Sequence, residues 1–279
     1  MSIAAEITLP AAPASPRAGW ALWPWQAWAT RLASLLACVL LWHWAASTRV
    51  HLGLVTFANV PPPLEVLNAG RDLLQSPKLL KHLGASLYRV FAGFLVAAIV
   101  GAGLGLVIGR FARARNALLP PLEVLRPIPA VAWIPLSILL FPSSEASMIF
   151  ITFVGAVFPI LLNTIHGVEG VDSRLIASAR SLGTRRLRVF TEVILPAAAP
   201  AIVTGLSIGM GTCWFCLVTA EMISGQFGIG YYTWESYTLQ NYPDIIVGML
   251  LIGVLGMGSS IALRQLGRAL MPWQRGSGQ

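Results

Sequence analysis

Residues 168–200 read VEGVDSRLIASARSLGTRRLRVFTEVILPAAAP and lie between two long apolar runs. Asp172 or Ser173 can cap the free N–H groups of a first helical turn, so a helix is predicted to about Leu182. Gly183 then suits the left-handed position that ends a helix. Five arginines make the stretch strongly basic: Arg174, Arg180, Arg185, Arg186 and Arg188.

A second short helix is predicted from about Thr184, a candidate N-cap, to Ile194, just before Pro196. The two helices and the glycine between them form an elbow in a loop too polar to lie in lipid. Two interpretations of this elbow stay open from its residues alone. It is either a docking surface for another protein or a positively charged loop that only fixes the membrane topology.

The composition indicates an integral membrane protein. Hydrophobic residues make up 56% of the chain, charged residues 11%, and the mean hydropathy is +0.72. A soluble domain carries about 25% charge. The net charge of +8 clusters at the ends of apolar runs, which favours membrane topology over nucleic-acid binding as its explanation.

The apolar runs predict an all-α protein with six transmembrane helices, at about 31–47, 85–109, 122–141, 145–167, 198–223 and 244–263. Residues 30–279 would form one transmembrane domain, with residues 168–197 as a loop between the fourth and fifth spans. Residues 1–29 are expected to be a cytoplasmic tail ending in an interfacial anchor, because tryptophan prefers the membrane–water interface. The tryptophans concerned are Trp20, Trp23, Trp25 and Trp28.

The distribution of basic residues predicts that the elbow and both termini are cytoplasmic. Thirteen arginines fall in segments on that side: Arg17, Arg31, Arg110, Arg113, Arg115, Arg174, Arg180, Arg185, Arg186, Arg188, Arg264, Arg268 and Arg275. Five basic residues are assigned to outer segments: Arg49, Arg71, Lys78, Lys81 and Arg89. Arg126 is placed within the third span.

Small residues recur every four positions along the second span, at Gly93, Ala97, Gly101, Gly105 and Gly109. This spacing puts them on one face, where they let another helix approach closely in lipid.

Three prolines, Pro127, Pro129 and Pro135, must interrupt the third span. Broken backbone survives in a membrane only where protein or water satisfies it, so this span is expected in the bundle interior beside a pathway. Glu221, in apolar surroundings near the outer end of the fifth span, is a second candidate for function, with simple placement at the interface as the alternative.

Two outer segments are expected to hold local structure. Residues from Leu64 to Leu74 have the spacing of a short amphipathic helix. Residues 224–243 are aromatic and polar, and are expected to form a re-entrant or interfacial hairpin.

Several kinds of chemistry have no motif in this sequence. There is no Walker A sequence, so energy for any pumping would come from a partner. Cys213 and Cys216 match C-x-x-C, but no second pair of ligands follows, so packing is the better explanation and no metal site is predicted.

The segment ASARSLG, followed by an apolar stretch and Ile194-Leu195-Pro196, resembles the "EAA" cytoplasmic loop of ABC importer permeases. The family glycine corresponds to Gly183, whereas Ala177 stands where the family has glutamate and Ser178 where it has the first alanine. The stretches 125–141, 155–172 and 220–223 also resemble one subfamily, the permeases for nitrate, sulfonates, taurine and bicarbonate. The resemblance covers about residues 60–270.

This resemblance implies a type I ABC importer permease bundle, MetI-like, with a cytoplasmic coupling helix in the bacterial inner membrane. It implies a small anion as substrate, a second permease copy, a periplasmic or lipid-anchored binding protein, and two ATPase subunits that bind ATP and Mg, with no cofactor in this chain. The expected ATPase-coupling residues are Ala177, Ser178, Ala179, Ser181, Leu182, Gly183 and Arg185. The expected translocation path includes Pro129, Trp133, Trp214 and Glu221.

Two other classes compete with this interpretation. A stand-alone secondary transporter or channel would need paired ionisable groups in the membrane and an internal repeat of spans. A membrane-embedded enzyme would need clustered His, Asp or Glu. The sequence shows none of these clearly.

Overall fold

The structure is a computed structural model that describes residues 24–51, 53, 56–224 and 227–273. Every element of regular structure within these ranges is a helix, apart from one isolated bridge between His51 and Thr56. Five helices are long and apolar enough to cross a membrane, or six if one bent pair counts as a single span. The chain divides into two compact units, residues 1–63 and residues 64–279, which are described separately.

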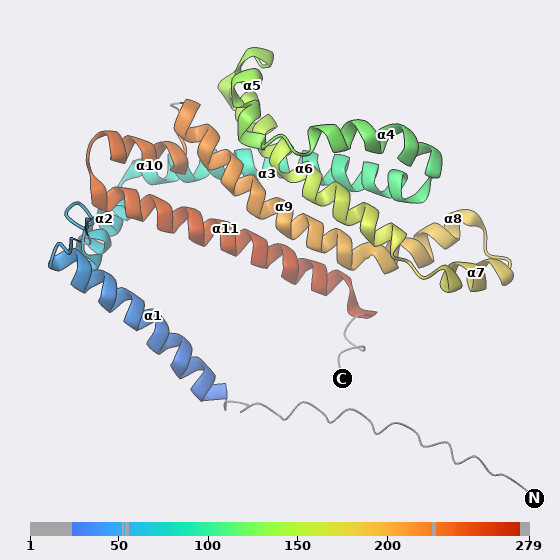
Figure 1. The fold of residues 1–279 in the computed structure, drawn as a ribbon, viewed down its shortest axis with the longest axis horizontal. Helices are drawn as coiled ribbons and strands as arrows, with labels where there is room; N and C mark the ends of the chain where they lie inside the picture. Colours follow the sequence, from blue (N-terminus) through green and yellow to red (C-terminus); the bar gives the residue numbers. More distant parts are fainter. Residues whose placement is uncertain (1–23, 52, 54–55, 225–226, 274–279) are drawn as a thin grey trace, which may run out of the picture. The chain divides into compact units, whose positions relative to one another are not determined.

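The first unit contains α1, Pro24–Ser47 (Figure 1). Trp25 and Trp28 lie in its first turns, so helix begins within the segment predicted as a tail. The guanidinium of Arg31 lies 5.3 Å from the ring centre of Trp28. At the other end, the indole nitrogen of Trp42 donates to the carbonyl of Pro61 at 3.1 Å. Trp20 and Trp23 lie outside the described residues.

The boundary between the units falls after the first residue of α2, Pro63–Gln75, and the second unit continues with α3, Pro77–Arg110. The predicted amphipathic helix at 64–74 is confirmed by α2. The helix α3 starts eight residues before the apolar run predicted from 85, because Ser76 caps it by accepting from the N–H of Lys78 and Pro77 occupies its first turn. One continuous helix therefore carries both a polar start and the small-residue face.

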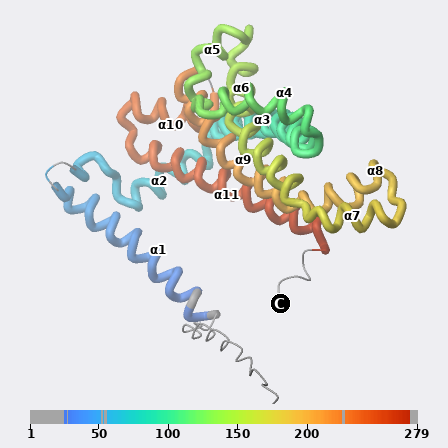
Figure 2. The backbone as a smooth tube through the Cα atoms, turned by 45° about the vertical axis from the view of Figure 1, so that its right-hand side comes forward, coloured from blue at the N-terminus to red at the C-terminus, as the bar shows by residue number. Residues whose placement is uncertain are grey.

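Three long helices form the core of this unit: α3, α6 at Ser144–Glu169, and α9 at Leu195–Ser224. The small residues of α3 face α6, so the predicted close contact with another helix is made there. A Cβ atom added at Gly93 would lie 2.7 Å from Thr152, and one at Gly105 would lie 2.6 Å from Thr164. Figure 2 shows these helices running side by side.

The third predicted span is strongly bent. The segment forms α4 at Ala112–Leu125, a 3₁₀ turn at Ala130–Trp133, and α5 at Ile134–Leu140, with an angle of 86° across the break. The expected burial in the bundle interior is wrong for the single chain: α4 buries none of its residues, and α5 buries only Ile134 and Ser137. Pro127 and Pro129 stop the helix before it can continue along the bundle.

The outer segment at 224–243 contains a helix, α10, at Ile229–Thr238. Gly228 precedes it with a φ of 154°, a conformation that residues other than glycine rarely adopt. The last helix, α11, spans Tyr242–Leu270 and packs against α9 and α10.

Candidate functional site: the basic elbow and the buried ion cluster

The first half of the elbow has the structure that its sequence predicts. The helix α7 spans Ser173–Ser181, and the Asp172 carboxylate accepts from the N–H of Arg174 at 2.8 Å. Gly183 has a φ of 77°. The N–H groups of Gly183 and Thr184 close the helix end on the carbonyls of Arg180 and Ala179, at 2.9 and 3.1 Å.

The second half differs from the prediction. Its helix α8 starts at Arg186 rather than Thr184, has no side-chain cap, and spans only Arg186–Arg188. It continues through a π-helical segment, Val189–Ile194, directly into α9. Pro196 does not end the helix, because widening the preceding turn relieves the clash of its ring with the carbonyl four residues earlier.

One side of the elbow is anchored and the other is free. Ile176 and Ala179 of α7 pack against an apolar cluster of Val168, Val189, Ile194 and Ala198, which belong to α6, the π-segment and α9. The opposite side exposes large apolar groups, and Leu182 is 85% exposed. Of the predicted coupling residues, Ala179 is half-buried and the others are exposed: Ala177, Ser178, Ser181, Leu182, Gly183 and Arg185.

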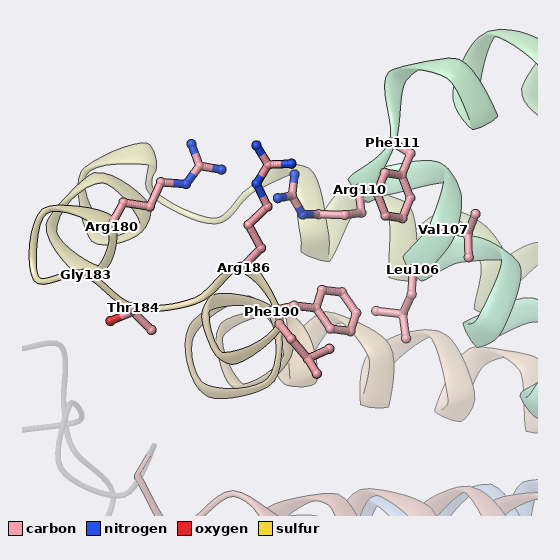
Figure 3. Close-up of a pocket in the computed structure, with 10 residues that line it drawn as sticks. Leu106, Val107, Arg110, Phe111, Arg180, Gly183, Thr184, Arg186 and Phe190 are labelled. Atoms are coloured by element: carbon pink, nitrogen blue, oxygen red, sulfur yellow. The ribbon is translucent and has the colours of Figure 1, made fainter.

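A pocket of about 1020 Å³ lies between this elbow and the end of α3 (Figure 3). Its apolar lining comes from Leu106, Val107, Phe111, Leu187 and Phe190. Three arginines also line it: Arg110, Arg180 and Arg186. In Figure 3 these three guanidinium groups point toward the same space.

A second group of charges is centred on Arg89, in the first half of α3, and includes the buried Glu221 of α9 and the partly exposed Glu145 of α6. Arg89 is 1% exposed and binds two carboxylates. Its Nε donates to Glu145 Oε2 at 2.9 Å and its Nη2 binds the other Glu145 oxygen. Its Nη1 donates to Glu221 Oε1 at 2.9 Å and to the carbonyl of Phe227.

Glu221 is fully buried and is held by several donors. Ser86 donates to its two oxygens at 2.8 and 3.0 Å, and the N–H of Gly230 donates to Oε2 at 2.9 Å. A Cβ atom on Gly228 would collide with this carboxylate. The cluster therefore joins α3, α6 and α9 to the start of α10.

This cluster bears on two interpretations drawn from the sequence. Arg89 was counted among the basic residues of the outer segments, and the structure shows it as a buried cation in α3, a helix long and apolar enough to cross a membrane. A pair of ionisable groups of the kind expected of a secondary transporter is therefore present between α3 and α9, so this criterion does not count against that class. The sequence did contain a sign of this cluster. Arg89 lies four residues into an apolar run, and a charged side chain in such a run needs a buried partner. The sequence analysis placed Glu221 in apolar surroundings and did not identify Arg89 as its partner.

The predicted path residues do not form one group. Trp214 is buried in the main apolar cluster and its indole nitrogen donates to Ser259 at 3.0 Å. Trp133 packs against the same cluster, and its indole Nε1 is the buried side-chain polar atom without a partner among the described residues. Pro129 is exposed just before the 3₁₀ turn. Glu221 belongs to the ion cluster.

A polar pocket of about 550 Å³ lies between α2, the start of α3, α10 and the start of α11. Its charged and titratable side chains include four carboxylates, Glu65, Asp72, Glu235 and Asp244, together with Lys78 and His82. Tyr231 donates to Glu235 at 3.1 Å. Burial, and then the charge of Asp244, raises the pKa of Tyr232 above its ordinary range, so this hydroxyl stays protonated.

The two cysteines of the C-x-x-C pattern are packing residues. Cys213 and Cys216 are buried in the core, and the Cys216 sulfur lies where a side chain on Gly155 would be, 2.5 Å from its added Cβ.

Comparison with known proteins identifies the family. The model of the binding-protein-dependent transport system inner membrane component matches residues 97–276. A putative ABC transporter permease protein of Methanocaldococcus jannaschii is 41% identical over 74% of this chain and 77% of the relative. A nitrate import permease protein of Leptolyngbya laminosa is 37% identical over 70% and 73%. The taurine transport system permease protein of Escherichia coli K12 is 33% identical over 90% and 92%.

A solved structure of the MetNI methionine ABC transporter, in inward-facing conformations, matches the fold with a TM-score of 0.59 at 19% identity. The match covers 69% of this chain and 95% of the other. It confirms the all-α permease bundle predicted from the sequence. The chain therefore belongs to the binding-protein-dependent transport inner membrane components, and it is a multi-pass permease subunit of an ABC importer, in which ATP hydrolysis belongs to a separate subunit.

Proposed function

We propose that the elbow is the surface through which this permease is driven by its ATPase. The observation that carries the proposal is the two-sided elbow: Ile176 and Ala179 are anchored on α6 and α9, while Leu182 and Arg185 are exposed. A partner that moves the exposed side must move the anchored helices with it. The predicted coupling residues from Ala177 to Arg185 form this surface.

In the proposed assembly, two copies of this chain line the path and two ATPase subunits bind ATP and Mg and dock on the two elbows. ATP binding closes the ATPase pair and draws the elbows together. The exposed faces of α4 and α5 support a second copy, because these helices bury little within one chain. The count of basic residues supports an elbow and both termini in the cytoplasm of a bacterium.

The proposed substrate is a small anion, such as nitrate, a sulfonate, taurine or bicarbonate. Permeases named for nitrate, aliphatic sulfonates and taurine are among the relatives. Arg89 does not provide the anion site, because two carboxylates already neutralise it. Hydroxyl groups, backbone N–H groups and the unpaired Trp133 indole would hold the anion weakly beside Pro129.

A binding protein would deliver this anion at the outer end. The pocket with four carboxylates and one lysine repels free anions, so direct entry from solution is disfavoured there. Delivery by a docked protein avoids this barrier, and basic side chains of that protein complement the pocket.

The test begins with the tagged chain, purified from native membranes in mild detergent with the proteins that accompany it. A stoichiometric ATPase subunit and ATP hydrolysis are expected. The variant Gly183→Pro should insert normally but lose the ATPase, because proline fixes φ near −65° and Gly183 has 77°. Gly53→Pro is the matched control, since Gly53 has a φ of 75° and equally open surroundings outside the elbow.

Normal ATPase retention and uptake in Gly183→Pro would contradict the coupling role. A wild-type chain that purifies alone, without ATP hydrolysis, yet moves solute in liposomes would contradict the assembly as a whole.

A further inference from the structure

The pocket beside the elbow gathers positive charge without neutralising it. Arg110 comes from the end of α3, and Arg180 and Arg186 come from either side of Gly183 (Figure 3). No described carboxylate pairs with any of the three. The ion pair in this part of the chain, between Arg115 and Glu169 at 2.7 Å, uses a different arginine.

Three like charges that face one space repel one another. This repulsion is stronger near a low-dielectric membrane than in water. An anion that binds between the guanidinium groups removes this cost. Arginine is suited to phosphate, because its planar fork donates two parallel hydrogen bonds.

Apart from Gly183 and Thr184, the rest of the pocket lining is apolar, and it lies at the end of the candidate span α3. Leu106 and Val107 belong to the last turns of α3, and Phe190 closes the pocket from the π-segment. Val107 and Phe111 are exposed, although both are large and apolar. A ligand that fits this lining must therefore have an anionic head and an apolar body.

We propose that this pocket binds an anionic phospholipid of the leaflet that surrounds the elbow. The lipid phosphate contacts Arg110, Arg180 and Arg186, and an acyl chain lies along Leu106, Val107 and Phe190. An acidic side chain of the ATPase subunit fits less well, because it would leave the apolar part of this pocket of about 1020 Å³ unfilled. The inference uses the membrane orientation of the proposed function, but it does not require that the elbow couples to an ATPase.

The position of the bound lipid would affect the movement of the elbow. Arg110 lies on a core helix, whereas Arg180 and Arg186 lie on the elbow. A lipid that binds all three connects the elbow to α3 and restrains its movement. Transport is therefore expected to depend on the anionic lipid content of the membrane.

The experiment measures lipid retained by the full-length chain, purified with its bound subunits and exchanged into vesicles of phosphatidylcholine with or without phosphatidylglycerol. Native mass spectrometry counts bound phosphatidylglycerol in the wild type, in Arg110→Gln/Arg186→Gln, and in Arg264→Gln/Arg268→Gln. The last variant removes two exposed arginines at the end of α11 that do not line the pocket. Binding should fall about 25-fold in the pocket variant, since each arginine contributes about fivefold near an anionic surface, and should stay unchanged in the control.

Equal retention in the two variants would overturn the proposal while leaving the permease assignment intact. Loss of the ATPase subunit from the pocket variant with lipid retention unchanged would assign the pocket to the ATPase interface instead. Displacement of the bound lipid by inorganic phosphate alone would reveal a site for free phosphate, and would also overturn the lipid assignment.

Discussion

Two arginines on the same helix show two different uses of charge. Arg89, in the first half of α3, is 1% exposed and contacts two carboxylates and a carbonyl. Arg110, at the end of α3, has the ring of Phe111 at 5.8 Å and no described carboxylate. They are 21 positions apart in the sequence, which corresponds to about 32 Å along the helix. A buried charge whose partners lie in the same chain connects its own helices, whereas a half-buried charge with no described carboxylate is available to another molecule.

The largest effect is expected from removing the buried charge. Arg89→Met leaves Glu221 buried without its cation, at a cost on the order of 3–5 kcal/mol. The expected result is a chain that is degraded or that unfolds far below the wild type in detergent, followed by circular dichroism. Adding Glu221→Gln should recover part of the loss. If Arg89→Met alone were as stable as the wild type, Arg89 would not differ from Arg110 in its contribution to stability.

A smaller loss of stability is expected from overpacking the contact between α3 and α6 at Gly105, which lies between the two arginines in the sequence. Gly105→Ala puts a methyl group 2.6 Å from Thr164, and overpacking of this kind costs about 1–3 kcal/mol. Gly103→Ala on the same helix has nothing within 4 Å and should leave stability unchanged or slightly raise it, since alanine favours helix. Thermal unfolding of both variants in the same detergent measures the difference. Similar unfolding temperatures for the two variants would show that the close contact between α3 and α6 at Gly105 does not contribute to stability.

A variant of Glu145 tests which carboxylate of the ion cluster is the main counterion of Arg89. Although Glu145 binds the fully buried Arg89, its own side chain is 46% exposed, and partly exposed ion pairs are worth about 1 kcal/mol or less. Glu145→Gln should therefore destabilise far less than Arg89→Met. An equal loss in unfolding temperature would mean that Glu145, rather than Glu221, is the main counterion.

The smallest effect on stability is expected at the elbow. Arg185 is exposed, so Arg185→Gln should change the free energy of unfolding by no more than about 0.5 kcal/mol. The same variant should weaken retention of the ATPase subunit on an affinity column. Unchanged retention would argue that Arg185 lies outside the docking surface.

Local signals predicted local structure well. Asp172 and Gly183 identified both ends of α7 because capping depends on residues within one turn. The spacing of Gly93 and Gly105 predicted a close helix contact, although not which helix would supply it. The start of α3 was missed because Ser76 and Pro77 precede the apolar run, and hydropathy alone does not mark a polar first turn.

The ion cluster was not predictable in the same way. Glu145 is 56 residues from Arg89 in the chain and Glu221 is 132 residues away, so no local pattern joins them. The path from α8 into α9 was also missed, because Pro196 normally ends a helix and the π-segment accommodates it. The bend of 86° after α4 depends on how three prolines divide one apolar run, which sequence spacing does not determine.

The order in which the cluster is synthesised has a consequence for biogenesis. Arg89 leaves the ribosome 56 residues before Glu145 and 132 residues before Glu221. At about 5–20 residues per second, it waits about 3–11 s for the first carboxylate. An unpaired arginine is costly in lipid, so we expect α3 to keep Arg89 near the lipid headgroups during that time and to reach its final position once Glu145 has emerged. In stalled nascent chains, a cysteine at Ser86 should become protected from a membrane-impermeant reagent once Glu145 has emerged, and Glu145→Gln should delay that protection.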